Sequence, residues 1–512
     1  MNLKRITALL TGLALLFSTA MAAGFGLDAQ SSAWLDADGD VRLALSAQFE
    51  TLDPYGEATV DMINALVKHV SVTAEMGEDK TVLEVDVAGE PVIDLTEKTV
   101  ENGTELTTGL LPNRVLTSRA SAIDALTAGE TGPSFDFFAA VSGLEDCYQQ
   151  LTDAIVPYAE EKKANYTIKN VAPSKWSRIA RLTPEQSAEL APFIAQVLGC
   201  GMDEAFRAQL LTAAYGKGFI VGLYQTQEGG EDVAVYMKGD MIFADGAKRT
   251  ISYQWAFADK ENGERVDTFK FEMKKAKAPK DDRIISASYK RMADETALKV
   301  KGESSARITD PDAGQTVTTT LTHDLNGKAD GEVRSVSGSL SRAVRTAVGE
   351  KAQTVTTTVK PDVKLVSMDG SAVLSGTAQV EQKTGKEVTL SAALSFDEEP
   401  AELLTSGAVY IVTEDMMPPS SLTQNLEKEA ADDYLVGKPP IGYTAHTAPT
   451  DRVTVDLDAD GDLSALMDEI SQNLAGKLLI ALSKLPGEDT ALLRDAMSET
   501  DYAAFMALVE GL

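Results

Sequence analysis

Long runs of strictly alternating residues fill the middle of this chain and constrain its fold more than any other feature. Between residues 218 and 397, apolar side chains recur at every second position, as in the run Ile251, Tyr253, Trp255 and Phe257. Such alternation predicts β-strands with one apolar and one polar face. Turn-forming pairs separate the runs, among them Asn262-Gly263, Asn326-Gly327, Asp369-Gly370 and Thr384-Gly385. We therefore predict a long antiparallel meander over 218–400, in which strands adjacent in sequence pair.

The chain before this meander has two different patterns. Residues 23–130 contain one alternating run, a helical pattern at Glu57–His69 and several short alternating runs, which predict a strand, a helix and a first meander. Residues 131–217 predict a helical insertion, because Phe135–Ala164 has helical spacing apart from a break at Pro157. Within it, the stretch Thr183-Pro184-Glu185-Gln186 has the residues of a capping box.

The chain after the meander predicts a change back to helices. Residues 401–450 are interrupted by Pro-rich breakers and predict a connecting region. Residues 451–512 predict one strand followed by helices, because Leu463–Leu482 carries an apolar stripe at helical spacing. The predicted fold class is α+β: a large curved antiparallel β-sheet packed with helices, plus a helical insertion and a C-terminal helical segment.

The first 22 residues have the parts of a secretory signal peptide. Lys4 and Arg5 give a positive start, an apolar run follows from Ile6 to Met21, and Ala20-Met21-Ala22 matches a cleavage site. The apolar run is shorter than the ~20 residues that a spanning helix needs, and no nearby cysteine could carry a lipid. We therefore predict cleavage of residues 1–22. The product is expected to be a bacterial protein of the cell envelope or exterior, secreted in soluble form and without a transmembrane segment.

The composition is acidic, with 78 Asp and Glu against 47 Lys and Arg and a net charge of −31. A chain this negative is repelled by nucleic acids and anionic lipid surfaces, so we expect no nucleic-acid partner. The apolar fraction of 44% is sufficient for a packed core.

Cys147 and Cys200 are the two cysteines of the chain. In an oxidising environment they can form one disulfide that closes a loop of about 53 residues. The chain-entropy model assigns such a bond about 4 kcal/mol of stabilisation. The alternative is two buried thiols, because the sequence does not define the geometry of the sulfur atoms. Both residues fall in the predicted helical insertion, so a disulfide would join two helices.

The hexapeptide Leu-Asp-Ala-Asp-Gly-Asp occurs at 35–40 and again at 457–462. Counted from Asp456, the second copy has Asp at positions 1, 3 and 5, Gly at position 6 and Leu at position 8 of a calcium loop. Met467, however, stands where position 12 requires a bidentate Glu. The first copy fits less well, because Trp34 takes position 1. We interpret both copies as Asp-Gly turns. The alternative is a calcium site made by Asp456, Asp458, Asp460 and Asp462.

No catalytic motif was found in the sequence. The three histidines, His69, His323 and His446, have no second His or Cys at metal-ligand spacing, and we interpret each as a surface or half-buried side chain. Zinc-peptidase, nucleophile-elbow and phosphate-loop motifs are absent. The Thr-rich runs Thr316–Thr322 and Thr354–Val359 are interpreted as solvent-facing strand. The sequence therefore predicts no catalytic residue and no cofactor other than the calcium alternative.

A helix followed by a long meander with one apolar face resembles the unclosed-barrel lipoprotein carriers of bacterial envelopes. The resemblance is one of pattern, covers Ala33–Leu116 and the 218–397 sheet, and includes no diagnostic motif. It implies a curved sheet that wraps helices and binds lipid on its concave face. The chain also resembles exported bacterial proteins in general, which implies no activity.

Three functions from different classes follow from these patterns. The first is an exported, non-enzymatic binding or scaffold protein that holds a lipid or other apolar ligand against the sheet. The second is a surface interaction protein stabilised by calcium. The third is an unrecognised hydrolase, since carboxylate pairs are abundant in so acidic a chain. A cavity, calcium-dependent melting or converging carboxylates would distinguish the three.

Overall fold

The computed structural model describes residues 40–52, most of 60–118, residues 135–167, residues 173–397 with short gaps, residues 453–457 and most of 464–489. The predicted signal peptide at 1–22, the predicted connecting region at 401–450 and the helices predicted beyond residue 490 lie outside the described residues.

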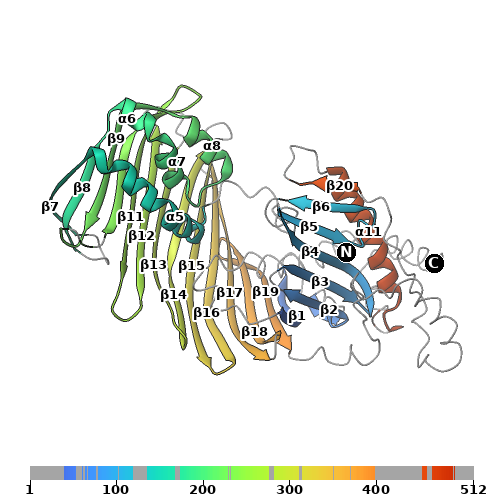
Figure 1. Ribbon diagram of the computed structural model, residues 1–512. Helices are drawn as coiled ribbons and strands as arrows, with labels where there is room; N and C mark the ends of the chain where they lie inside the picture. Colours follow the sequence, from blue (N-terminus) through green and yellow to red (C-terminus); the bar gives the residue numbers. More distant parts are fainter. Residues whose placement is uncertain are drawn as a thin grey trace, which may run out of the picture.

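Twenty strands form one sheet in the described part of the chain (Figure 1). In chain order they are β1 (Asp40–Leu52), β2 (Val70–Met76), β3 (Lys80–Val87), β4 (Glu90–Val100), β5 (Gly103–Thr108), β6 (Arg114–Ser118), β7 (Ala159–Thr167), β8 (Pro173–Arg181), β9 (Ala214–Gln225), β10 (Asp232–Ile242), β11 (Lys248–Asp259), β12 (Arg265–Lys275), β13 (Arg283–Ala293), β14 (Ala297–Asp310), β15 (Gln315–Asp330), β16 (Val333–Val348), β17 (Lys351–Met368), β18 (Ser371–Thr384), β19 (Glu387–Asp397) and β20 (Val453–Asp456).

The sheet consists of two antiparallel meanders joined by β1. One meander runs from β7 to β19 and the other from β2 to β6, and within each the strands pair in sequence order. β1 lies between them, because it pairs antiparallel with β19 on one side and with β2 on the other. Among the strands that the structure describes, parallel pairing is confined to β20 beside β6 and to a short contact between β1 and β18. Among the described strands β7 and β20 are not paired with each other, so the sheet is open.

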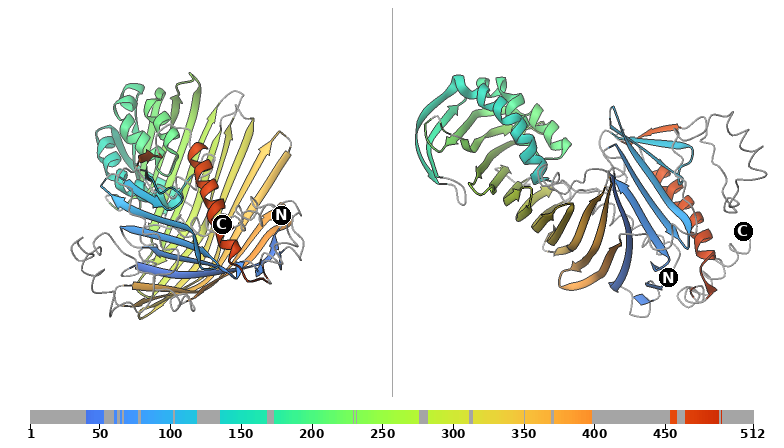
Figure 2. Two further views of the ribbon diagram at one scale, coloured as in Figure 1. Left: turned by 90° about the vertical axis from the view of Figure 1, so that its right-hand side faces the viewer. Right: turned by 60° about the horizontal axis from the view of Figure 1, so that its bottom comes forward.

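Helices gather at the two ends of the sheet. At one end lie α5 (Phe137–Ile155), the 3-10 turn η2 (Val156–Tyr158), α6 (Pro184–Glu189), α7 (Ala191–Gly199) and α8 (Glu204–Thr212), and at the other lies α11 (Ser464–Ser483). Figure 2 shows the two helical groups far apart, with the middle strands between them. None of the described helices is long and apolar enough to span a membrane.

One face of the sheet carries the core, and we call it the inner face. Residues directly opposite on paired strands point to the same side, so the register carries this face from strand to strand. At one end it contributes Tyr253, Trp255 and Phe271 to a large apolar core with α5, α7 and α8. At the other end it contributes residues such as Val85 and Leu106 to clusters that include the leucines of α11.

The predicted α+β class with a large antiparallel sheet and helices is confirmed. The capping box at Thr183 is also confirmed. The Thr183 side chain accepts a hydrogen bond from the Gln186 amide, and the Gln186 side chain accepts one from the Thr183 amide. The strands of the long meander are long and reach 18 residues in β17.

Two local predictions were wrong. The stretch up to Ala164 is not helical throughout, because the chain leaves the helix at Pro157, which has no amide hydrogen to donate, and then forms β7 paired with β8. The predicted turn at Asn326-Gly327 lies inside β15, where Leu325 is buried in the core. The chain reverses instead at Gly331, whose φ of +62° suits a turn.

Candidate functional site

A charged cluster lies buried in the inner face beneath α5. Asp267 on β12 has no solvent exposure and accepts hydrogen bonds from the indole N–H of Trp255 at 3.1 Å and from the guanidinium of Arg291 at 2.6 Å. Arg265 lies 3.4 Å from the same carboxylate and pairs with Glu145 of α5 at 2.8 Å. A carboxylate buried to this depth is tolerated only with such partners. The cluster therefore ties α5 to the strands beneath it.

A buried tyrosine–histidine pair lies next to this cluster. The hydroxyl of Tyr289 lies 3.0 Å from Nδ1 of His323, Phe137 stacks on the Tyr289 ring, and Phe138 meets the His323 ring edge-on. Burial raises the pKa of Tyr289 to about 12. His323 is only 5% exposed, so the interpretation of this residue as surface or half-buried was wrong. Its inward position on β15, covered by Phe138, accounts for the difference.

Of the other two histidines, only His69 lies in the part of the chain that the structure describes. His69 is half-buried, as predicted, and its Nε2 lies 2.6 Å from the carboxylate of Asp489. This hydrogen bond is the main cause that lowers the pKa of Asp489. His446 lies outside the described residues.

The structure brings together the two cysteines that the sequence singled out. Cys147 is buried on α5, and Cys200 follows directly after α7. Their sulfur atoms are 3.8 Å apart, a contact in which either thiol can donate, and no disulfide joins them. A disulfide between them stays a prediction.

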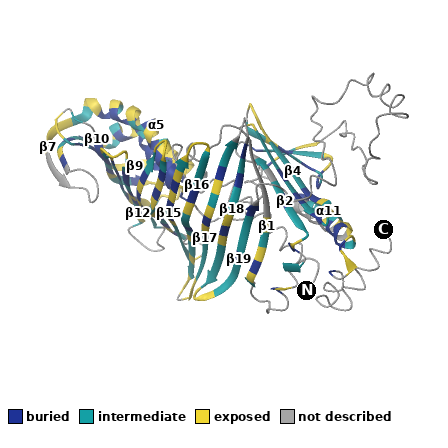
Figure 3. Cartoon of the chain, turned by 90° about the horizontal axis from the view of Figure 1, so that it is seen from below, coloured by how far each residue is buried: buried dark blue, intermediate teal, exposed yellow. Residues whose placement is uncertain are grey.

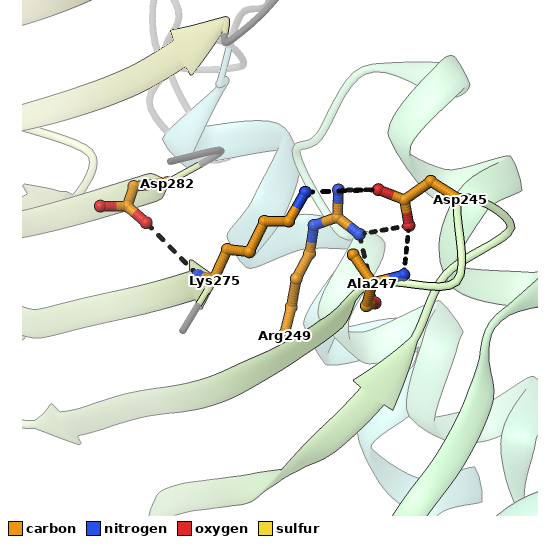
Figure 4. A network of polar contacts seen from close by, with 5 residues as sticks. All are labelled: Asp245, Ala247, Arg249, Lys275 and Asp282. Atoms are coloured by element: carbon orange, nitrogen blue, oxygen red, sulfur yellow. Dashed lines mark hydrogen bonds and ion pairs between the residues drawn. The ribbon is translucent and has the colours of Figure 1, made fainter. Parts of the chain in front are cut away.

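A second ionic network closes the turn between β10 and β11 (Figure 4). The guanidinium of Arg249 donates to both oxygens of Asp245 at 2.9 Å, and Lys275 of β12 approaches the same carboxylate at 3.7 Å. The hydrogen bonds from Arg249 and from the Ala247 amide lower the pKa of Asp245 far below its usual range. Arg249 also lies over the ring of Phe243, so we assign this network to the stability of the hairpin end.

The middle of the inner face carries apolar side chains on β16–β19. We call Leu340, Val359, Val363, Val380 and Leu394 the central stretch. The register places Leu340, Val359 and Val380 directly opposite one another. Val359 and Val363 pack against the cores at both ends of the sheet, so the apolar face is continuous. Except for buried Leu340, these residues are half-buried, and Figure 3 shows their strands between α5 and α11.

The opposite face of β2–β4 gathers carboxylates. Burial, and then the nearby charges of Asp86, Asp94 and Glu75, raise the pKa of Glu84. Burial and the charge of Glu90 likewise raise the pKa of Asp86. Within the described residues no group of His, Cys, Asp or Glu has an arrangement that could hold a metal ion.

Replacing Glu84 with Gln is expected to stabilise the protein at neutral pH. The folded-state pKa of Glu84 is raised, so the folded protein binds this proton more tightly than the unfolded chain. Stability therefore falls as the pH rises from the unfolded towards the folded pKa. Thermal melts should give a higher Tm for E84Q at about pH 7, and the difference should vanish below the unfolded pKa of about 4.3. Glu261→Gln in an exposed turn is the control, and an equal response of both variants would contradict the prediction.

The structure describes one of the four aspartates of the calcium alternative, which therefore stays a prediction. Asp456 ends β20 and is exposed, whereas Asp458, Asp460 and Asp462 lie outside the described residues. The Thr-rich runs lie on β15 and β17, where their threonines are mostly half-buried.

The charged cluster at Asp267 was missed at the sequence level, although a signal for it exists. Arg265 and Asp267 continue the alternation of Phe269, Phe271 and Met273, which places both charges on the apolar face of their strand. Charges in phase with an apolar face point to buried ion pairs, because an isolated buried charge is too unfavourable to persist.

Comparisons with known proteins assign no family. No family model matches the chain, and no curated protein matches it. Among solved structures, OmpT, an outer membrane protein of Vibrio cholerae, matches with 8% identity and a TM-score of 0.24 over 70% of this chain and 94% of that one. A loop L8 deletion mutant of OmpT matches with 8% identity and a TM-score of 0.25 over 70% and 96%. Scores this low do not establish a common fold, so the properties of these proteins are not transferred to this chain.

Proposed function

We propose that this protein is an exported, non-enzymatic binding or scaffold protein that holds an apolar ligand of lipid type against the central stretch of its sheet. Export rests on the signal-peptide pattern of residues 1–22. The observation that carries the binding role is the continuous apolar inner face, whose middle stays half-buried between two helix-covered ends.

The contrast between the middle and the ends of the inner face supports this role. At the helix-covered ends, residues such as Trp255, Phe271 and Leu478 are at most 1% exposed, as expected for a closed core. In the middle, Val359, Val363 and Val380 keep part of their apolar surface in contact with water. Apolar area is stabilised on leaving water by about 25 cal/mol per Å², so a row of such valines favours an apolar partner.

The two faces of β17 make the role testable on one strand. Val359 and Val363 point to the inner face, while Thr356 and Thr358 alternate with them and point to the opposite face. All four side chains are half-buried. Lysine pairs at these positions add the same charge to opposite sides of the same strand.

The test is native mass spectrometry of residues 23–512, purified after export from a bacterial host. We expect a copurified mass of lipid size on the wild-type protein, its loss in V359K/V363K and its retention in T356K/T358K. Circular dichroism would first establish that both variants are folded. A wild-type protein without any bound mass, or equal retention by both folded variants, would refute binding at the central stretch.

A further inference from the structure

We propose that Cys147 and Cys200 form a disulfide in the exported protein, and that this bond holds the β7–β8 edge of the sheet in place. The two sulfur atoms are already 3.8 Å apart on neighbouring elements. A disulfide has an S–S length of about 2.05 Å, so forming it requires a relative shift of the sulfurs by roughly 2 Å.

Helix α5 leaves space for the Cys200 sulfur at Gly143. A β-carbon at Gly143 would lie 3.2 Å from Sγ of Cys200, closer than an ordinary contact. Gly143 stands four residues before Cys147, so both lie on the same side of α5. Glycine is unfavourable inside a helix, and here its missing side chain lets the sulfur of Cys200 approach that of Cys147.

Tyr253 on β11 is a buried polar residue in the neighbourhood of the two cysteines. Its side chain is 1% exposed, and its hydroxyl has no hydrogen-bond partner in the described structure. The cysteines lie near enough to contribute, after burial, to raising the pKa of Tyr253. In the reduced state the thiols donate to the carbonyl groups of Leu144 and Gln196. Oxidation removes both thiol hydrogens and with them these two hydrogen bonds.

The reaction is a thiol–disulfide exchange with an oxidised dithiol oxidoreductase of the cell exterior. Cys200 is half-buried and Cys147 is 2% exposed, so the thiolate of Cys200 attacks the disulfide of the oxidant first. This step forms a mixed disulfide and releases one thiolate of the oxidant. The thiolate of Cys147 then attacks the Cys200 sulfur and releases the second one. Two electrons and, overall, the two cysteine protons pass to the oxidant, which becomes a dithiol.

The bond would enclose one edge of the sheet. The chain between Cys147 and Cys200 contains β7, β8, α6 and α7. Among the described strands β7 pairs only with β8, so it is an edge strand. Edge strands open most easily because one side of their backbone has no partner. With the disulfide, this segment is tied at both ends to the core beneath α5.

The experiment compares the exported protein, residues 23–512, with a Cys147→Ser/Cys200→Ser double variant. We expect intact-mass measurement to give the wild type a mass lower by two hydrogen atoms than the dithiol form. Non-reducing peptide mapping should yield one peptide that joins the two cysteines. Hydrogen exchange of β7 and β8 amides should be several-fold faster in the variant, while β15 and β16 exchange equally in both proteins.

Either of two results overturns the proposal: two free thiols after export, or a disulfide whose loss leaves exchange in β7 and β8 unchanged. If the serine variant does not fold, wild-type protein treated with a reductant under native conditions provides the same comparison. A uniform acceleration across β15 and β16 as well would mean general destabilisation and would reject the local role at the edge.

Discussion

Replacing Asp267 with Ala should lower the free energy of unfolding by about 3–5 kcal/mol, the range for breaking a buried ion pair. The substitution would leave the guanidinium of Arg291, whose side chain is 8% exposed, without its carboxylate, and the indole N–H of Trp255 without its acceptor. Chemical denaturation followed by circular dichroism measures this change as a shift of the transition midpoint.

Two controls separate charge burial from loss of packing. Glu145 is the half-exposed member of the cluster. Replacing it with Ala should lower the free energy of unfolding by less than about 1 kcal/mol, because exposed ion pairs contribute little to stability. The double variant Asp267→Leu/Arg291→Met replaces the pair by apolar side chains and should recover much of the lost stability. Equal effects of Asp267→Ala and Glu145→Ala would show that the buried carboxylate contributes no more to stability than the exposed one.

Replacing Gly218 with Ala should destabilise the protein by about 4 kcal/mol, at the upper end of single-substitution effects. Gly218 in β9 has a φ of +83°, and a β-carbon there would lie 2.0 Å from the carbonyl oxygen of Leu182. The backbone is held at this distance because the Leu182 amide donates to the carbonyl of Phe219 at 2.8 Å. The alanine variant must therefore disrupt the junction between β8 and β9.

Gly263 is a matched control, since it has almost the same backbone conformation in open space. Its φ is +79°, and nothing lies within 4 Å of the position that a β-carbon would take. Gly263→Ala should lower the free energy of unfolding by only about 1–2 kcal/mol, because its sole effect is to place a residue other than glycine in the left-handed backbone conformation. Equal thermal shifts for the two variants would mean that the β8–β9 junction relaxes freely around an added methyl group.

Local patterns were sufficient to predict most of the sheet. Alternation at Ile251–Phe257 and the turn at Asn262-Gly263 gave β11, β12 and their pairing, because both depend on residues close in sequence. The strand β7 was not predicted, because Ala159–Thr167 is rich in Glu and Lys and has no apolar alternation. Such charges are typical of an edge strand, which is protected from further pairing rather than packed in a core.

The candidate sites were less accessible to sequence analysis because they depend on contacts between distant residues. The sequence identified Cys147 and Cys200 but not the 3.8 Å between their sulfurs, which is set by the packing of α5 against α7. The central stretch depends on the register of four neighbouring strands. The pairing of β1 with β19 depends on residues far apart in the sequence, and no local pattern encodes it.

The position of β1 between the two meanders has a consequence for the order of assembly. The chain is synthesised from its N-terminus, so β1 and β2 can pair early, but the other edge of β1 must wait for β19, which is made much later. Pairing between segments this distant in sequence is slow, because a long loop must close before any contact forms. The join between β1 and β19 is therefore expected to form late, and until then both strands present an open edge.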